Sequence, residues 1–149
     1  MKKFSELRVG DTFFSTCTIS DKELEEYLKF SRVRNAFLED KQEGEQIVSG
    51  RAILSRMEGE FTRLSQIYGN HIIFLGTDGD PEWKNRATRF LKPLHVDQVL
   101  KLKFTVSQKD DMDDEFGKIA IDYEGTTQDG EAVVLSKRNI YRIKKEPPR

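Results

Sequence analysis

The residues from 50 to about 68 form the longest helical pattern in the chain, and no other segment constrains the fold as much. The pattern follows Ser49 and closes at Gly69-Asn70, a pair typical of the C-terminal end of a helix. At about 100° per residue, apolar side chains form one stripe with two more at its edge: Ile53, Met57, Leu64 and Ile67, flanked by Leu54 and Phe61. The sequence therefore predicts a central helix over residues 50–68, packed on a broad surface.

Strand patterns lie on both sides of this helix. Residues 13–19 precede it and are rich in Thr and Phe, and a short apolar run at 71–75 follows it. Three later segments alternate apolar with polar residues, as half-buried strands do: 99–107, 119–123 and 132–143. The phase of the last one shifts near 136–138, as a β-bulge would produce. One dominant helix and several antiparallel strands place the chain in the α+β class, with a curved sheet wrapped around the helix.

A second, shorter helix is predicted before the central one. Ser20 and Glu23 have the spacing of a capping box, in which each side chain bonds a backbone amide near the other residue. The helix that follows should bury Leu24, Tyr27 and Leu28. Residues 31–46 are polar and irregular, and we expect a surface loop with one helical turn.

Length and composition limit the classes of protein that remain. At 149 residues the chain is most simply one domain, residues 1–149. A formal net charge of −1 argues against a nucleic-acid partner. We find neither a signal peptide nor an apolar run near the roughly 20 residues of a membrane span, so no membrane partner is expected. Cys17 is the only cysteine, which excludes an internal disulfide and fits a reducing, cytoplasmic location.

Five segments, in order along the chain, resemble the MaoC-like (R)-specific enoyl-thioester hydratases and dehydratases, which adopt the hot-dog fold. The opening Phe4–Asp11 is similar to theirs, and Ile47-Val48-Ser49-Gly50 resembles the I-V-H-G that begins their central helix. The other segments are 31–40, Arg89–Leu94 with Asp97, and Gln128–Glu131. Together they cover most of the chain, so the resemblance implies a hot-dog fold.

The catalytic segment of that family is altered in this chain. It reads roughly S-G-D-x-N-P-(I/L)-H-x-D, and its Asp and His hold and activate a water. Ser31, Asn35 and Asp40 match the pattern, whereas the acid falls on Val33 and the imidazole on Leu38. Neither replacement can transfer a proton, so the resemblance implies a protein defective in hydration.

The resemblance also implies a ligand. The ligand would be an acyl thioester of coenzyme A or acyl carrier protein, with coenzyme A part of the substrate and no separate cofactor. The amide of Gly50 would stabilise the thioester oxyanion, and Ser31, Asn35 and Ser49 would contribute to binding. The chain would form a homodimer, or a hetero-oligomer with a catalytic hot-dog partner that supplies the missing Asp and His.

Two further functions remain open. Glu60 falls about 20° from Ile53 on the helical projection, with Arg56 and Arg63 spaced to pair with it. It is a candidate base or nucleophile for an acyl-thioester hydrolase, or else a paired structural glutamate. The other possibility is a non-enzymatic sensor or scaffold for acyl chains. We expect structural roles for His71, His95 and Cys17, and no metal site.

Overall fold

The computed structural model describes residues 1–35, 46–77 and 87–147. Its helices and strands are, in chain order, η1 (Phe4–Glu6), β1 (Thr12–Cys17), α1 (Asp21–Ser31), α3 (Gly50–Arg63), β2 (Ile72–Thr77), β3 (Thr88–Phe90), β4 (Leu100–Asp111), β5 (Phe116–Thr126) and β6 (Ala132–Lys144). Most of the expected loop at 31–46 lies outside these residues, and so do the motif positions Leu38 and Asp40.

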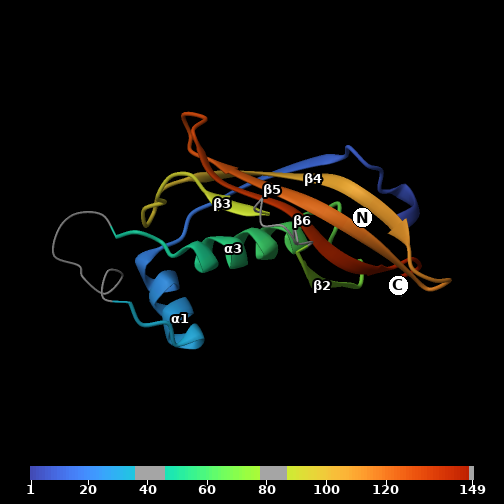
Figure 1. Ribbon diagram of the computed structural model, residues 1–149, viewed down its shortest axis with the longest axis horizontal. Coiled ribbons are helices and arrows are strands. Elements are labelled where there is room, and N and C mark those ends of the chain that lie inside the picture. The colour runs from blue at the N-terminus through green and yellow to red at the C-terminus, as the bar shows by residue number, and fades with distance from the viewer. Residues whose placement is uncertain (36–45, 78–86, 148–149) are drawn as a thin grey trace.

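The strands form one six-stranded sheet with the order β1-β4-β5-β6-β2, and β3 also pairs with β6. Every pairing is antiparallel. Figure 1 shows the sheet arching over α3, which runs along one face, while α1 projects from the helix side away from the strands. The predicted α+β class, with a sheet wrapped around one central helix, is confirmed.

Helix α3 is held by its apolar face. Ala52, Ile53, Met57 and Phe61 are buried against the sheet. The ring of Phe61 lies 5.5 Å from that of Phe104 and 5.1 Å from that of Tyr141, measured between centroids. Such pairs contribute about 0.5–1.5 kcal/mol each beyond the area they bury. The stripe seen in the sequence is therefore the surface that joins the helix to the sheet.

The predicted end of this helix was wrong. Helix α3 stops at Arg63, and Leu64 has an extended backbone with φ −56° and ψ 139°. Separate turns follow, in which the amides of Ile67 and Tyr68 bond to the carbonyl of Leu64. The break buries both Leu64 and Ile67, at 9% and 1% exposure. Gly69, with φ 105°, belongs to these later turns and not to the helix end.

The capping box that opens α1 is confirmed. The amide of Glu23 donates to Oγ of Ser20, and the amide of Ser20 donates to the Glu23 carboxylate, both at 3.1 Å. Leu24 is fully buried, while Tyr27 and Leu28 pack against the core from its edge. The guanidinium of Arg56 donates to the carbonyl of Thr18 and forms an ion pair with Glu23, which joins α3 to the start of α1.

The bulge expected in the last strand is also confirmed. The register between β5 and β6 shifts where Ile121 faces Asn139 and Tyr123 faces Ser136. Arg138 has φ 56°, and its amide donates to Asp122 at 2.9 Å. The left-handed backbone conformation of a residue other than glycine costs free energy, and contacts such as this hydrogen bond offset that cost.

Strand β4 is longer than predicted. It runs to Asp111, well past the expected end at residue 107, and the acidic turn is shorter. Its polar second half pairs with the first half of β5 through a bulge between Val106 and Gln108. Alternation of side chains could not reveal this half, because it is largely exposed on both faces.

Candidate functional site

A cavity of about 380 Å³ lies between helix α3 and the sheet. Four of its lining residues come from α3: Arg51, Leu54, Ser55 and Glu58. Their spacing of three or four residues places them on one face of the helix. That face differs from the one that carries Ile53 and Met57 into the core.

Strand β2 forms much of the opposite wall, through Phe74, Gly76 and Thr77. The register of β2 against β6 shifts between Phe74 and Gly76. Gly76 has φ 141°, which side chains other than glycine rarely tolerate. A bulge bends a strand, so this glycine gives β2 its course along the cavity.

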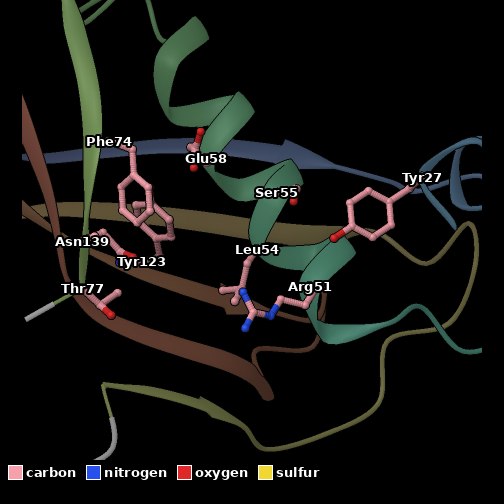
Figure 2. A pocket seen from close by; sticks show the side chains of 10 residues that line it. Tyr27, Arg51, Leu54, Ser55, Glu58, Phe74, Thr77, Tyr123 and Asn139 are labelled. Carbon is pink, nitrogen blue, oxygen red and sulfur yellow. The ribbon is translucent and has the colours of Figure 1, made fainter. Parts of the chain in front are cut away.

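The ends of the cavity are formed by aromatic residues. Figure 2 shows Tyr27 of α1 at one end, and Phe74 and Tyr123 at the other, with the side chains of α3 between them. Tyr123 comes from β5, and its ring packs edge-on against Phe104 at 5.4 Å between centroids. The cavity therefore spans from the short helix to the middle of the sheet.

The end of the cavity formed by Phe74 and Tyr123 is called the inner end here. Tyr123 is paired there with a second tyrosine, Tyr141. The hydroxyls of Tyr123 and Tyr141 are hydrogen-bonded to each other, and the two residues are 3% and 1% exposed. Burial is the main cause that raises the pKa of both groups, and the negative charge of Glu58 raises each pKa further. Both hydroxyls are therefore neutral and can donate and accept hydrogen bonds.

Glu58 is the one carboxylate among the residues that line this cavity. It is half-buried, and within the described part of the chain no hydrogen bond or ion pair holds its carboxylate. Arg51 lies two turns away along α3, is exposed, and points its guanidinium into the space beside Leu54 (Figure 2). The cavity thus offers a cation near the helix start and an anion deeper inside.

The N-terminus of α3 lies next to this cavity. Ser49 is the N-cap, and its Oγ accepts a hydrogen bond from the amide of Ala52 at 3.4 Å. None of the described residues accepts from the amide of Gly50. A first-turn amide carries part of the positive charge of the helix dipole, so Gly50 presents a donor able to bind a carbonyl oxygen.

The other motif residues carried over from the resemblance lie outside the cavity lining. Ser31 ends α1, and its Oγ donates to the carbonyl of Leu28 and accepts from the amide of Val33, both at 3.4 Å. Val33 is 43% exposed, and Asn35 is exposed. Tyr27, one turn before Ser31, is the residue of α1 that reaches the cavity.

Glu60 does not line the cavity either. Its carboxylate accepts a hydrogen bond from Oγ of Ser15 at 3.5 Å, on the side of β1. The expected pairing with Arg56 and Arg63 is wrong for the described residues, because Arg56 pairs with Glu23. The helix places Glu58, two residues earlier, on the cavity wall.

Arg51, Ser55 and Glu58 were not predicted as site residues from the sequence. One signal was available: together with Leu54 they recur at helical spacing, as a second and mostly polar stripe. Such a stripe normally indicates a solvated face, and only the strand and helix packed around it make it the wall of a cavity.

The histidines and the cysteine lie outside this cavity lining. His95 faces Ile47 in an isolated bridge, and His71 precedes β2. Cys17 is 9% exposed, and burial raises its thiol pKa to about 11, so little of it is the reactive thiolate at neutral pH.

Across residues 1–35, 46–77 and 87–147, no three His, Cys, Asp or Glu side chains gather in a way that could bind a metal. None of the described helices has the length and apolar character needed to span a membrane.

Comparison with solved structures identifies the fold. A monoamine oxidase regulatory protein from Archaeoglobus fulgidus superposes with a TM-score of 0.76 at 20% identity, covering 97% of this chain and 95% of its own. The (R)-hydratase PhaJ1 of Pseudomonas aeruginosa gives 0.66 at 20% identity, over 99% and 86% of the two chains. A MaoC-like dehydratase from Rhodospirillum rubrum gives 0.66 at 15% identity, over 98% and 99%.

Comparisons of sequence alone are negative. No family model matches the chain, and no curated protein does. The superpositions nevertheless cover nearly the whole chain, 97% and 98% of it for the first and third of these structures. A hot-dog-like protein from Thermanaerovibrio acidaminovorans also superposes, with a TM-score of 0.54 at 11% identity, over 93% of this chain and 82% of its own. The chain therefore has the hot-dog fold, in the form found in MaoC-like dehydratases and (R)-hydratases.

Proposed function

We propose that this protein binds an acyl thioester, with the thioester carbonyl at the amide of Gly50 and the acyl group in the cavity beside α3. The observation that carries this proposal is the position of the cavity. Its lining begins at Arg51, the residue after Gly50, and continues inward for about two helical turns to Glu58. A carbonyl bound at the helix start would thus direct its acyl chain into existing space.

The start of α3 supplies the hydrogen-bond donor and the positive charge that such a site needs at the thioester oxygen. The Gly50 amide and the dipole of α3 would favour negative charge on the thioester oxygen. Arg51, exposed at the same end, adds a positive charge that would further favour negative charge on the thioester oxygen. Ser49 supports the site by capping the helix, and its side chain is thereby already engaged.

The acid and base of hydration are absent from the motif. Val33 stands at the position of the acid and Leu38 at that of the imidazole. A positioned acid or base typically contributes about 10²–10⁴-fold in rate. We therefore propose that the chain alone hydrates enoyl thioesters poorly, and that Ser31 and Asn35 are remnants of the family's segment that contribute to binding.

Assembly with a second hot-dog chain belongs to this proposal. Strand β2 ends the sheet and pairs only with β6 among the described strands. Three consecutive apolar side chains on it are exposed: Ile73, Phe74 and Leu75, at 52%, 41% and 52%. An apolar, unpaired edge is a template for another strand. The partner would be a second copy, or a related chain that carries the missing Asp and His.

Hydrolysis of the thioester is a second candidate. The residue proposed for it is Glu60, since a carboxylate on the central helix can act as base or nucleophile. Its contact with Ser15 directs it toward β1, so hydrolysis would require a site on that side of the helix. The fold also suits an acyl-chain sensor that has no turnover.

One set of assays on the purified chain separates these functions. Calorimetric titration with octanoyl-coenzyme A, and with free coenzyme A as control, should show micromolar binding that requires the acyl group. Crotonyl-coenzyme A should not be hydrated, measured by loss of the enoyl absorbance. Thiol release can be followed with Ellman's reagent, because buried Cys17 gives little background.

The possible results have different meanings. Failure of every acyl thioester to bind would contradict the proposal. Hydration at an ordinary enzymatic rate would overturn the proposal that the chain is defective in hydration. Thiol release that Glu60→Gln abolishes would establish hydrolysis of the thioester. Hydration that appears only after co-purification with another hot-dog chain would identify the chain as a binding subunit.

A further inference from the structure

The inner half of the cavity is more polar than a plain alkyl chain requires. Pockets for acyl chains and other apolar ligands are lined mainly by apolar side chains, with a few placed polar groups. Here Glu58, Tyr123 and Asn139 share the inner end with Phe74. The amide of Asn139 is already engaged, because it donates to the carbonyls of Ile121 and Ser136 at 3.1 Å. The groups left to meet a ligand are the Glu58 carboxylate and the hydroxyl of Tyr123, which is bonded to that of Tyr141.

The Glu58 carboxylate requires a hydrogen-bond donor once the cavity is filled. It is half-buried and, among the described residues, bonded to no other side chain. A carboxylate can only accept hydrogen bonds. Covering it with methylene groups would remove its water without replacement, which is strongly unfavourable. A ligand with a donor at this depth would avoid that loss.

The tyrosine pair supplies the complementary hydrogen. Two hydroxyls that bond to each other use one of their two hydrogens, and Tyr123 and Tyr141 are joined in this way. The second hydrogen has no described acceptor in the protein. Glu58 and Tyr123 both line this cavity, and the negative charge of Glu58 raises the pKa of both tyrosines. An acceptor and a donor therefore meet at the inner end of the cavity.

We propose that the acyl group bound in this cavity carries a hydroxyl remote from its thioester, which donates to the Glu58 carboxylate and accepts from the Tyr123–Tyr141 pair. This inference rests on the proposed acyl-thioester function and narrows its substrate class to distally hydroxylated acyl chains. A hydroxyl matches the site because it donates and accepts at once, whereas an alkyl end does neither.

The geometry sets the length of the chain. Gly50 and Glu58 are eight residues apart, which is about 12 Å along a helix axis. An extended chain advances about 1.3 Å per bond, and a helical side chain leans back toward the N-terminus, so a chain of roughly eight carbons reaches the carboxylate. A volume of about 380 Å³ holds about a dozen groups of water size, at about 30 Å³ each, which accommodates such a chain.

The experiment compares octanoyl-coenzyme A with its ω-hydroxy analogue by calorimetric titration. Wild-type protein should bind the hydroxylated ligand about tenfold more tightly, as one hydrogen bond to a charged group would produce. Glu58→Leu should reverse the preference, because the pocket then presents an apolar wall. Glu58→Gln, which keeps an acceptor oxygen, should retain part of it. Glu26→Gln removes an exposed carboxylate of α1 outside the cavity lining and should keep the full preference.

The comparison in wild-type protein decides the inference even if a variant does not fold. Equal binding of the two ligands, or tighter binding of octanoyl-coenzyme A, would overturn the hydroxyl assignment and leave the acyl-thioester function intact. An unchanged preference in folded Glu58→Leu would overturn it as well. Absence of binding by both ligands would instead refute the proposed function.

Discussion

The ring of Phe90 occupies the space that a side chain on Gly50 would need, since a Cβ built on Gly50 would lie 2.7 Å from Cζ of Phe90. Strand β3 thereby places an aromatic ring on the first residue of α3. Phe90 is 46% exposed, so its ring can turn outward. A Cβ built on Gly117 would likewise lie 2.3 Å from Cε1 of Phe4, but Phe4 is only 7% exposed.

Alanine at these two glycines should therefore have different effects. Gly117→Ala should lower the free energy of unfolding by about 1–3 kcal/mol, because overpacking must displace a buried ring. Gly50→Ala should change it by less than about 1 kcal/mol. Urea denaturation of both variants measures the difference, and equal losses would show that the ring of Phe90 is as firmly held as that of Phe4.

The tyrosine pair allows a double-mutant cycle. Tyr123→Phe or Tyr141→Phe alone leaves one buried hydroxyl without its partner, which should cost about 1–3 kcal/mol. The double variant removes both hydroxyls and should be more stable than the sum of the single losses predicts. Chemical denaturation of the four proteins gives the coupling energy. Strict additivity would mean that the two hydroxyls do not depend on each other.

Stability should depend on the Cys17 thiol at high pH. Burial raises its pKa from 9.0 to about 11, so the folded protein binds a proton that the unfolded chain releases. The thiol's contribution is fully present below pH 9 and is lost as the pH rises toward 11. Wild type should lose about 1 kcal/mol more than Cys17→Ala between pH 8 and 10. Parallel curves for the two proteins would contradict the raised pKa.

The exposed edge of β2 should govern assembly. Replacing Leu75 with lysine adds a charge to an apolar edge, which opposes strand pairing, and should shift the protein from dimer to monomer. Val9→Lys is the matched control, because Val9 is also exposed, at 62%, and lies away from β2. Sedimentation equilibrium at tens of micromolar measures the change. A monomeric wild type, or a dimer indifferent to Leu75→Lys, would disprove this interface.

Local chemistry was sufficient for much of the fold. The capping box at Ser20 and Glu23 and the alternation in β4 and β6 involve neighbouring residues whose physical preferences do not depend on the rest of the chain. The bulge near Arg138 was visible as a change in phase. The helix end was not, because the apolar stripe continues through Leu64 and Ile67 whether they belong to a helix or to the turns that follow.

The pattern of residues alone implies that a helix with one apolar face lies against a curved sheet, and that two motif positions carry Val33 and Leu38 in place of proton-transferring groups. Which carboxylate of α3 lines the cavity depends on how the folded chain packs around the helix. Glu58 and Glu60 both project from one helix, and their surroundings depend on β2, β1 and α1, which are remote in sequence. Periodicity assigns residues to a face of a helix, whereas the packing of distant segments determines whether that face meets solvent, protein or a ligand.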